Sequence, residues 1–181
     1  GIYEGSIVPV APVSSLDGIG VRPLMYELAM YMPSPMEHTY HGINPKTKSM
    51  HIRHADMSES FTAQVFKTIA DPFVGKMTFF KVMSGTLTND LTMKNVTSGT
   101  TEKMAHIYTM RGKKQTEVTS LCCGDIGMIA KLAGTNTNDT LTVSSDFEYR
   151  KIAFPHPYYT MAITPAAKGD EDKISTGIAR L

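Results

Sequence analysis

Four histidines that lie close together in the sequence are the first residues with the chemistry to hold a metal. His38 and His41 form one H-x-x-H pair, and His51 and His54 form a second pair. Imidazole nitrogens bind zinc, but structural zinc sites usually combine histidine with cysteine at short, regular spacings. No cysteine or acidic partner accompanies either pair at such a spacing, and no helical pattern places a pair on one face. We therefore expect no metal site.

The two cysteines of the chain, Cys122 and Cys123, are adjacent. Neighbouring side chains on a strand point to opposite faces, and a single adjacent pair cannot form the framework of a disulfide-stabilised protein. A free cysteine usually behaves as a small buried hydrophobic residue. We expect two reduced thiols, as in a cytosolic protein, with a vicinal disulfide or redox pair as the alternative.

No set of residues has the spacing of a catalytic site. Neither a nucleophile beside a base nor a cluster of carboxylates stands out, so we expect no catalytic residue. Residues 17–20, D-G-I-G, fit a D-x-x-G motif for magnesium, but a G-x-x-x-x-G-K-[ST] loop and an N-K-x-D motif are absent from the sequence. We interpret residues 17–20 as a turn. His106 lies between apolar neighbours, and we expect it to be a structural histidine.

The composition is that of a globular protein without a strong overall charge. Hydrophobic residues make up 41% and charged residues 19% of the 181 residues, and the formal net charge is +1. These values allow a core and a local basic face, but they argue against a strongly basic nucleic-acid-binding protein. No apolar run approaches the roughly 20 residues of a membrane span, and the first residues lack the features of a signal peptide. We expect a cytoplasmic protein without a membrane partner.

Residues 1–36 have the pattern of a strand, a loop and a helix. Residues 7–13, IVPVAPV, are apolar like a buried strand, and apolar residues then recur with helical spacing from Val21 to Met32. The prolines that follow predict the end of this helix. Such a unit is typical of the closing part of an α/β sheet. Residues 37–58 are polar and poorly periodic, so we expect a linker there.

Residues 59–145 have the pattern of antiparallel β-structure. Alternation predicts that Ala63, Val65 and Ile69 share one face of the first strand. It also predicts that Phe80 and Val82 share one face of the second strand. Six or more short strands at even spacing, without an intervening helix, are typical of a barrel. We therefore expect a closed antiparallel β-barrel over this range.

Residues 154–181 have the pattern of a strand followed by a helix. Residues 158–165, YYTMAITP, alternate like a strand, and Ile174, Ile178 and Leu181 then share one face of a helix. No helix stop signal follows Leu181, and the apolar stripe is still continuing there. We expect this region to begin another domain and the chain to be a fragment of a longer protein.

The run from Val65 to Lys114, together with the AGTNTNDTL stretch that begins at Ala133, resembles the second domain of elongation factor G and related translational GTPases. Residues 7–35 resemble the end of the G domain of that family, with its fifth guanine-nucleotide motif. Residues 158–181 resemble the opening of the third domain. The stretches KGDEDKIS and MRGKKQ are more similar to a bacterial elongation factor G-like paralogue than to the main translocase.

The resemblance implies a mainly β fold, with a closed antiparallel translation-factor barrel between partial α/β and α+β pieces. It implies a full-length GTPase that binds GTP with magnesium, docks on the ribosome and acts in translation elongation. This segment lacks the phosphate-binding motifs, so we expect it to bind no nucleotide and not to be an enzyme by itself. In the full-length protein, Ser14, Ser15 and Leu16 would form the guanine-facing edge, with the backbone N–H of Ser15 toward guanine O6.

The resemblance also implies contact with small-subunit ribosomal RNA and packing against the G domain and third domain of the same chain. The first candidates for RNA contact are Arg111, Lys113 and Lys114, and the second are Lys94 and Lys103, because such side chains neutralise phosphates. The alternative for each residue is a solvated hairpin charge. The alternative for the whole chain is a stand-alone OB-like RNA-binding or interaction module, in which basic and aromatic residues would alternate.

Overall fold

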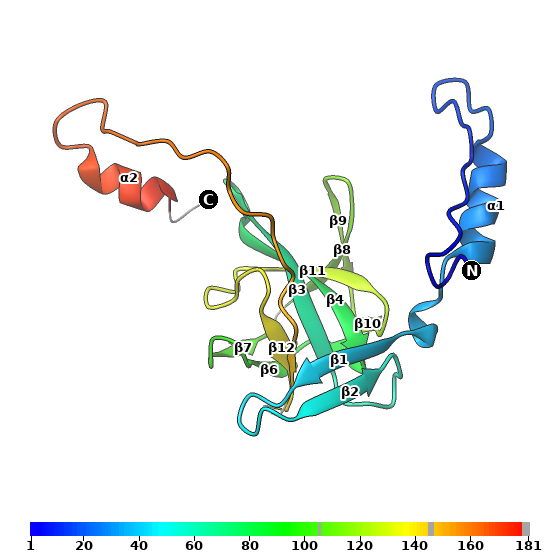
Figure 1. The fold of residues 1–181 in the computed structure, drawn as a ribbon. Coiled ribbons are helices and arrows are strands. Elements are labelled where there is room, and N and C mark those ends of the chain that lie inside the picture. Colours follow the sequence, from blue (N-terminus) through cyan, green and yellow to red (C-terminus); the bar gives the residue numbers. More distant parts are fainter. Residues whose placement is uncertain (105, 145–146, 179–181) are drawn as a thin grey trace. The chain divides into compact units, whose positions relative to one another are not determined.

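The computed structural model describes residues 1–104, 106–144 and 147–178, and the chain forms two compact units. The first unit is Gly1–His38 and the second is Thr39–Leu181. The first unit contains helices, whereas the second is mainly antiparallel β-structure. Figure 1 labels most of the helices and strands of both units.

The first unit contains α1 (Val21–Tyr31) and a short 3-10 helix, η1 (Pro35–Glu37). The helix predicted from the spacing of the apolar residues is thereby confirmed, and proline prevents its continuation. Gly20 precedes α1 with a φ of 77°, and a Cβ there would lie 2.5 Å from the Pro12 carbonyl oxygen. Both the backbone angle and the close contact therefore require glycine at this position.

The strand expected at residues 7–13 is wrong. These residues form no strand, and the side chains of Val8 and Val10 are 79% and 88% exposed. An isolated antiparallel bridge joins Ser14 and Ile19 around a turn. A buried strand of an α/β sheet needs neighbouring strands, and the described part of this unit contains none.

An eight-stranded antiparallel sheet dominates the second unit (Figure 1). Its strand order over the described residues is β7–β6–β12–β3–β4–β11–β8–β9, and β5 and β10 form a separate pair. The expectation of a mainly antiparallel β fold is confirmed. The strand bounds are β3 (Thr62–Asp71), β4 (Gly75–Ser84), β5 (Thr86–Thr88), β6 (Thr92–Asn95), β7 (Thr101–Lys103), β8 (Ile107–Arg111), β9 (Lys114–Val118), β10 (Ser120–Cys122), β11 (Ile126–Ala130) and β12 (Thr140–Thr142).

The core of the second unit lies on one face of the eight-stranded sheet. Val65 on β3 is opposite Phe80 on β4, and both side chains are fully buried. The predicted placement of Phe80 and Val82 on one face is confirmed. Ile69 is 37% exposed, against the expectation, because a register shift between Val65 and Lys67 moves the following residues to the other face. The core cluster further includes Ala63, Leu87, Met93, Met104, Ile107, Leu121, Ile129 and Leu141.

The linker expected at residues 37–58 is wrong over much of its length, because a β-hairpin lies there. The hairpin pairs with a short later strand in a three-stranded sheet of order β13–β1–β2. The inward positions of its first strand are Tyr40 and Gly42, so the alternating aliphatic residues that predict a half-buried strand are missing. The strands of this sheet are β1 (Thr39–Ile43), β2 (Met50–His54) and β13 (Glu148–Tyr149).

The last described part of the second unit is irregular chain followed by a helix. Residues 158–165, expected as a strand, form none, and the side chain of Tyr158 is 95% exposed. The expected helix is present as α2 (Glu171–Ile178), while Leu181 and Ser145, the expected last barrel residue, lie outside the described residues. No helix in the described ranges has the length and apolar character needed to cross a membrane.

Candidate nucleic-acid interface

Arg111, Lys113 and Lys114 lie together at the end of one β-hairpin. Arg111 ends β8, Lys114 begins β9, and these two residues are opposite each other in the register. Gly112 has a φ of 59°, as a two-residue hairpin turn requires, and Lys113 completes the turn. All three basic side chains are exposed. The hairpin end therefore presents a compact group of positive charges to solvent.

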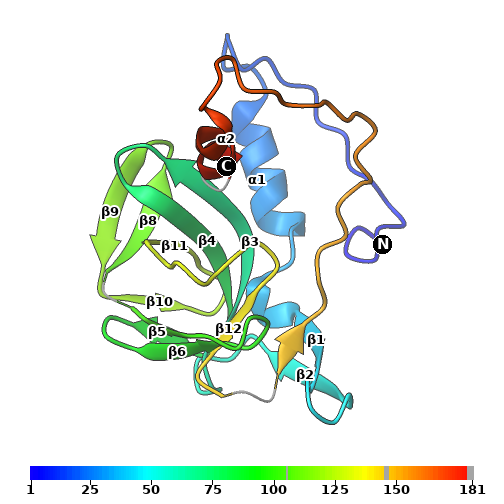
Figure 2. The ribbon, with the colours of Figure 1, turned by 90° about the vertical axis from the view of Figure 1, so that its left-hand side faces the viewer.

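Lys94 and Lys103 lie together on another hairpin. Lys94 on β6 is opposite Thr101 on β7, and Lys103 on β7 is opposite Thr92 on β6. Both lysine side chains are exposed. β6 lies apart from the β8–β9 hairpin in both Figure 1 and Figure 2. The structure therefore divides the predicted basic residues into two separate groups.

His106 lies at the surface, beside the strands that carry the first basic group. Its Nδ1 atom is 2.6 Å from Glu117 Oε1, and its side chain is 61% exposed. The next residue, Ile107, is fully buried and opposite Val118, which anchors the β8–β9 hairpin to the core. Alternate residues of this segment thus face opposite sides, as in any strand.

Ser14, Ser15 and Leu16 form the first part of a turn in the first unit. Ser14 Oγ donates a hydrogen bond of 2.7 Å to Asp17 Oδ2, and Ser14 N donates to the Ile19 carbonyl at 2.9 Å. Ser15 is exposed, and the side chain of Leu16 is 94% exposed. The interpretation of residues 17–20 as a turn is confirmed, because Asp17 is engaged by Ser14 within that turn.

The clustered histidines lie on the β1–β2 hairpin or immediately before it. His41 on β1 is opposite Ile52, whereas His51 on β2 is opposite Gly42 on the other face. The ring of His38, which precedes β1, stacks against Tyr3 with 6.2 Å between the ring centroids. Within the described ranges, no three side chains of His, Cys, Asp or Glu are placed to hold a metal ion.

Cys122 and Cys123 are free thiols, and both are half-buried. Cys122 N donates a hydrogen bond of 2.9 Å to Asp125 Oδ2, and Cys123 packs against the core cluster. Burial raises the pKa of the Cys123 thiol, so its reactive thiolate form is disfavoured at neutral pH. This environment is typical of a structural cysteine.

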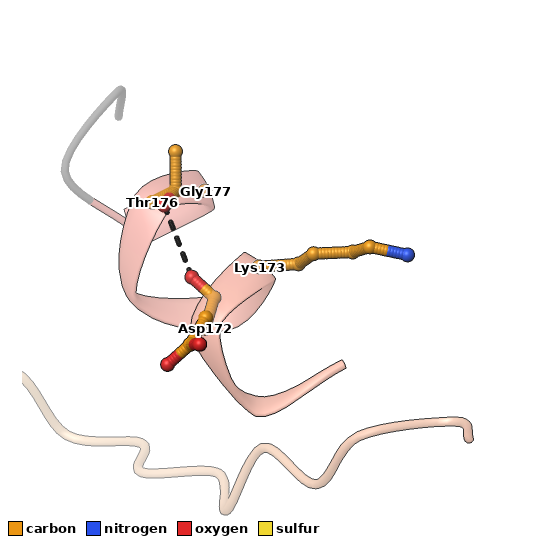
Figure 3. A pocket seen from close by; sticks show the side chains of 4 residues that line it. All are labelled: Asp172, Lys173, Thr176 and Gly177. Atoms are coloured by element: carbon orange, nitrogen blue, oxygen red, sulfur yellow. Dashed lines mark hydrogen bonds between the residues drawn. The ribbon is translucent and has the colours of Figure 1, made fainter. Parts of the chain in front are cut away.

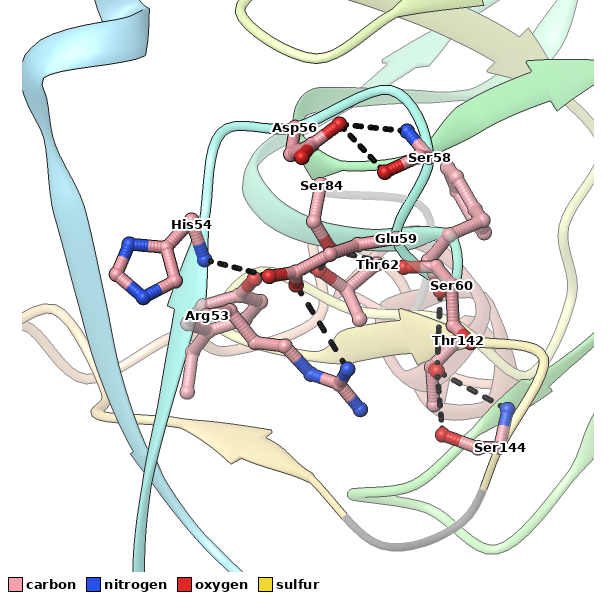
Figure 4. Close-up of polar contacts among 12 residues, drawn as sticks. Arg53, His54, Asp56, Ser58, Glu59, Ser60, Thr62, Ser84, Thr142 and Ser144 are labelled. Atoms are coloured by element: carbon pink, nitrogen blue, oxygen red, sulfur yellow. Dashed lines mark hydrogen bonds and ion pairs between the residues drawn. The ribbon is translucent and has the colours of Figure 1, made fainter.

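A buried group of hydroxyls connects the three-stranded sheet to β3. The hydroxyl of Tyr149 on β13 lies 2.5 Å from Thr62 Oγ1, which lies 2.7 Å from Ser84 Oγ. Burial raises the pKa of the Tyr149 hydroxyl, which keeps the phenol neutral. Figure 4 shows Thr62 and Ser84 among the surrounding polar residues. Sequence reasoning missed this group because its members are far apart along the chain.

An ion pair connects β2 to the loop that leads into β3 (Figure 4). Arg53 is 3.7 Å from Glu59 Oε2, and His54 N donates a hydrogen bond of 3.4 Å to Glu59 Oε1. The Arg53 guanidinium also lies 5.5 Å from the centroid of the Phe147 ring. These contacts hold the hairpin that sequence reasoning took for a linker. The sequence around Arg53 and Glu59 did not indicate this ion pair, because charged residues in a polar stretch are equally typical of a linker.

A second buried polar group holds the loop between β11 and β12 against the β6–β7 hairpin. Asn95 is fully buried, and its Nδ2 donates a hydrogen bond of 2.7 Å to Asp139 Oδ2. The same carboxylate oxygen accepts from Asn136 N at 2.7 Å. Glu102 Oε1 on β7 accepts from Gly134 N at 2.9 Å. These bonds position the strands that carry Lys94 and Lys103.

A pocket lies on α2 and is drawn in Figure 3. It is lined by Asp172, Lys173, Thr176 and Gly177. Thr176 Oγ1 donates a hydrogen bond of 3.0 Å to the Asp172 carbonyl within the helix. All the lining residues belong to one short helix, and none is a predicted site residue, so we assign the pocket no function.

The sequence is similar to proteins of translation elongation. The profile of the family described as Elongation factor G domain 2 matches residues 60–144. Elongation factor G of Karelsulcia muelleri (strain GWSS) is 37% identical over 177 residues, which cover 97% of this chain and 26% of that protein. The chain thus spans about a quarter of the length of this curated relative.

A solved structure supports the fold. The crystal structure of a protein from Thermus thermophilus matches with a TM-score of 0.68 and 22% sequence identity, over 93% of this chain and 23% of that chain. At this identity the match supports the fold alone, whereas the family follows from the profile and from the curated relative. Residues 60–144 belong to the elongation factor G family, of which they form domain 2.

Proposed function

We propose that this chain is the domain 2 region of a ribosome-associated, cytoplasmic translation elongation factor that hydrolyses GTP. The observation that carries the proposal is the 37% identity to an elongation factor G over 97% of this chain. In this proposal the region docks the factor on the ribosome and relays movement between its neighbouring domains. GTP hydrolysis would take place elsewhere in the full-length protein, because the P-loop and N-K-x-D motifs are absent from this sequence.

We further propose the division of the chain between domains. Residues 1–36 would end a G domain, residues 59–145 would form domain 2, and residues 154–181 would begin a third domain. The profile match to residues 60–144 supports the middle assignment. The pairing of β1 with β13 argues that residues 39–54 work together with domain 2 and not as a flexible linker.

We propose that the strands of domain 2 close into a barrel. Strands from different parts of the sheet order contribute to a single core cluster, which includes Met93 from β6, Val65 from β3 and Ile107 from β8. β4 and β6 are not neighbours in the strand order, although only the short strand β5 separates them along the chain. A curled sheet satisfies both observations, and closure would leave fewer exposed strand edges.

In this proposal, the end of the β8–β9 hairpin contacts small-subunit ribosomal RNA. Arg111, Lys113 and Lys114 are exposed on a hairpin whose base is anchored in the core. Their charges would neutralise phosphates, which makes binding weaker as salt rises. Lys94 and Lys103 would provide a second, separate contact.

The turn at residues 14–16 would contribute to the guanine-binding edge of the full-length protein. Ser14 N is already bonded to the Ile19 carbonyl. The N–H of Ser15 has no hydrogen-bond partner among the described residues, and the residue is exposed. A free backbone donor suits a carbonyl oxygen such as guanine O6, so this position fits the proposed role of Ser15. GTP and its magnesium ion would need the rest of the G domain.

The test is binding of the 181-residue chain to purified small ribosomal subunits between 50 and 200 mM KCl. We expect binding that weakens with salt. Combined replacement of Arg111, Lys113 and Lys114 by Gln should lower the affinity and reduce the slope of log K against log salt by about two to three. Lys46→Gln, on the β1–β2 turn, is the control. Absence of binding by the unchanged chain would contradict the docking role, and full binding by the triple variant would contradict the assigned contact.

A further inference from the structure

The side chain of Asn138 binds the chain that leaves the three-stranded sheet after β13. Its Nδ2 atom donates a hydrogen bond of 3.1 Å to the Ile152 carbonyl, and its Oδ1 atom accepts one of 2.7 Å from Ile152 N. An amide has both a donor and an acceptor, so it can bind both backbone groups of a single residue. The two bonds replace those that a neighbouring antiparallel strand would form.

The backbone of Asn138 is held against the core strand β3. Asn138 N donates a hydrogen bond of 2.8 Å to the Val65 carbonyl, and Val65 N donates one of 2.9 Å to the Asp139 carbonyl. Val65 itself is fully buried. The φ of Asn138 is 79°, in the left-handed region that glycine, asparagine and aspartate adopt most readily. Asparagine therefore suits this position both by its backbone conformation and by its side chain.

The residues on both sides of Asn138 in the loop between β11 and β12 are bonded to two hairpins. Asn136 Oδ1 accepts a hydrogen bond of 2.8 Å from Lys76 Nζ on β4. Asp139 Oδ2 accepts one of 2.7 Å from the buried amide of Asn95 on β6. A force on the bonds of Asn138 is therefore transmitted to the β3–β4 and β6–β7 hairpins, because the loop itself is fixed.

The series of bonds that holds the outgoing chain ends at Ile152. Before it, Tyr149 N donates a hydrogen bond of 2.9 Å to Thr140 Oγ1, and Gln64 Nε2 donates one of 2.9 Å to the Arg150 carbonyl. After it, residues 153–165 form no helix or strand, and no hydrogen bond within the described part of the chain engages them. The restraint on the chain thus stops at one position.

We propose that Asn138 is a positioning residue that clamps Ile152 and sets the point after which the outgoing chain pivots. Residues 149–152 move with the eight-stranded sheet, and the chain from Ala153 onward moves relative to it. Release of the clamp moves the pivot back toward Tyr149 and frees residues 150–152, which add about 10 Å of reach when extended. The use of this pivot in relaying movement rests on the proposed function, whereas the clamp itself does not.

The experiment measures backbone N–H order parameters of the 181-residue chain by NMR, which distinguish rigid from flexible residues. In the unchanged chain we expect values of about 0.85 up to Ile152 and values below about 0.6 in the residues that follow. Asn138→Gly keeps the left-handed backbone but removes both bonds, so the drop should move to Lys151 or earlier. In the same variant, trypsin should cleave after Lys151 about tenfold faster.

Two further variants separate the clamp from general effects. Lys48→Gly is the matched control, because Lys48 also has a positive φ, of 60°, and lies on the β1–β2 turn. Asn138→Asp keeps the acceptor for Ile152 N but loses the donor, so its cleavage rate should be intermediate. A drop before Ile152 in the unchanged chain, or equal cleavage of all three variants, would overturn the clamp. If the clamp is found but the chain does not bind small ribosomal subunits, the relay role fails and the clamp stands.

Discussion

The hydroxyl of Tyr149 lies 2.5 Å from the hydroxyl of Thr62, although 87 positions separate the two residues in the sequence. Tyr149 belongs to the three-stranded sheet and Thr62 begins the central strand of the eight-stranded sheet. The contact therefore connects the two sheets at a buried point. It explains why residues 39–54 belong to the second unit and do not form a free linker.

Tyr149→Phe should lower the free energy of unfolding by about 1 kcal/mol, because the variant removes one buried hydrogen bond while Thr62 keeps its contact with Ser84. Urea denaturation measures the change. Tyr158→Phe is the control, since Tyr158 is 95% exposed and should show no effect. An equal midpoint for both variants would mean that the buried hydroxyl contributes nothing to stability.

Gly42→Ala should destabilise the second unit by about 2 kcal/mol or more, because a Cβ at this position would overlap Phe147 Cζ and lie 2.5 Å from the Glu148 carbonyl oxygen. Urea denaturation again gives the magnitude, and protease digestion should show early cleavage within residues 39–54. Gly177→Ala on α2 is the control, because nothing lies within 4 Å of a Cβ there. Equal stability of the two variants would refute tight packing at Gly42.

Asp71→Ala should loosen the tip of the β3–β4 hairpin, whereas Asp71→Asn should keep it, because an amide oxygen can accept the same two backbone N–H groups. The pKa of Asp71 is lowered from 3.8 in the folded chain. The stabilisation by its charge is thus complete above that ordinary value and is lost as the pH falls through the lowered pKa. NMR signals of the Phe73 and Val74 amides should shift in that acid range in the unchanged chain and not in Asp71→Asn.

Asn95→Ala should cost roughly 2 kcal/mol, because it leaves the buried Asp139 carboxylate without its side-chain donor. The loop between β11 and β12 should then exchange its amide hydrogens faster. Ser98→Ala serves as the control, because it truncates a polar side chain near β6 that is exposed and not buried. Unchanged exchange in that loop would show that the buried amide does not hold it.

Cys123 should react slowly with iodoacetamide at neutral pH, because burial raises the pKa of its thiol and limits access to it. The measurement uses Cys122→Ser, which leaves Cys123 as the single thiol, and compares its rate with that of glutathione. The rate should rise with pH as the thiolate forms. Unfolding in urea is the internal control and should bring the rate close to that of a free thiol. A fast reaction in the folded state would contradict a structural role.

The elements that could be predicted from the sequence are those whose own residues show a helical or strand-like apolar repeat. α1 has apolar residues at helical spacing, and Phe80 and Val82 share one buried face of β4. Elements whose stability depends on distant partners were missed. β1 packs through Gly42 against Phe147, and no pattern near residue 42 reveals a contact made more than one hundred positions later. Residues 7–13 and 158–165 show the opposite error, because neither an apolar run nor a strand-like alternation forms a strand where the described residues provide no partner.

The candidate site was predictable in part. Basic residues in a short turn are visible in the sequence, so Arg111, Lys113 and Lys114 were correctly expected to lie together in a hairpin turn. Whether Lys94 and Lys103 extend that group depends on strand order, which sequence periodicity does not determine.

The register shift after Val65 determines on which face of β3 the following side chains lie. For this placement, the number of residues in the strand matters more than their types. Phe66 is the extra residue, and it sets Lys67 on the solvent side. Loss of Phe66 would leave a regular strand in which Lys67 stays on the same face. Natural variants of this hairpin should therefore tolerate a deletion at this point without moving the following residues to the other face.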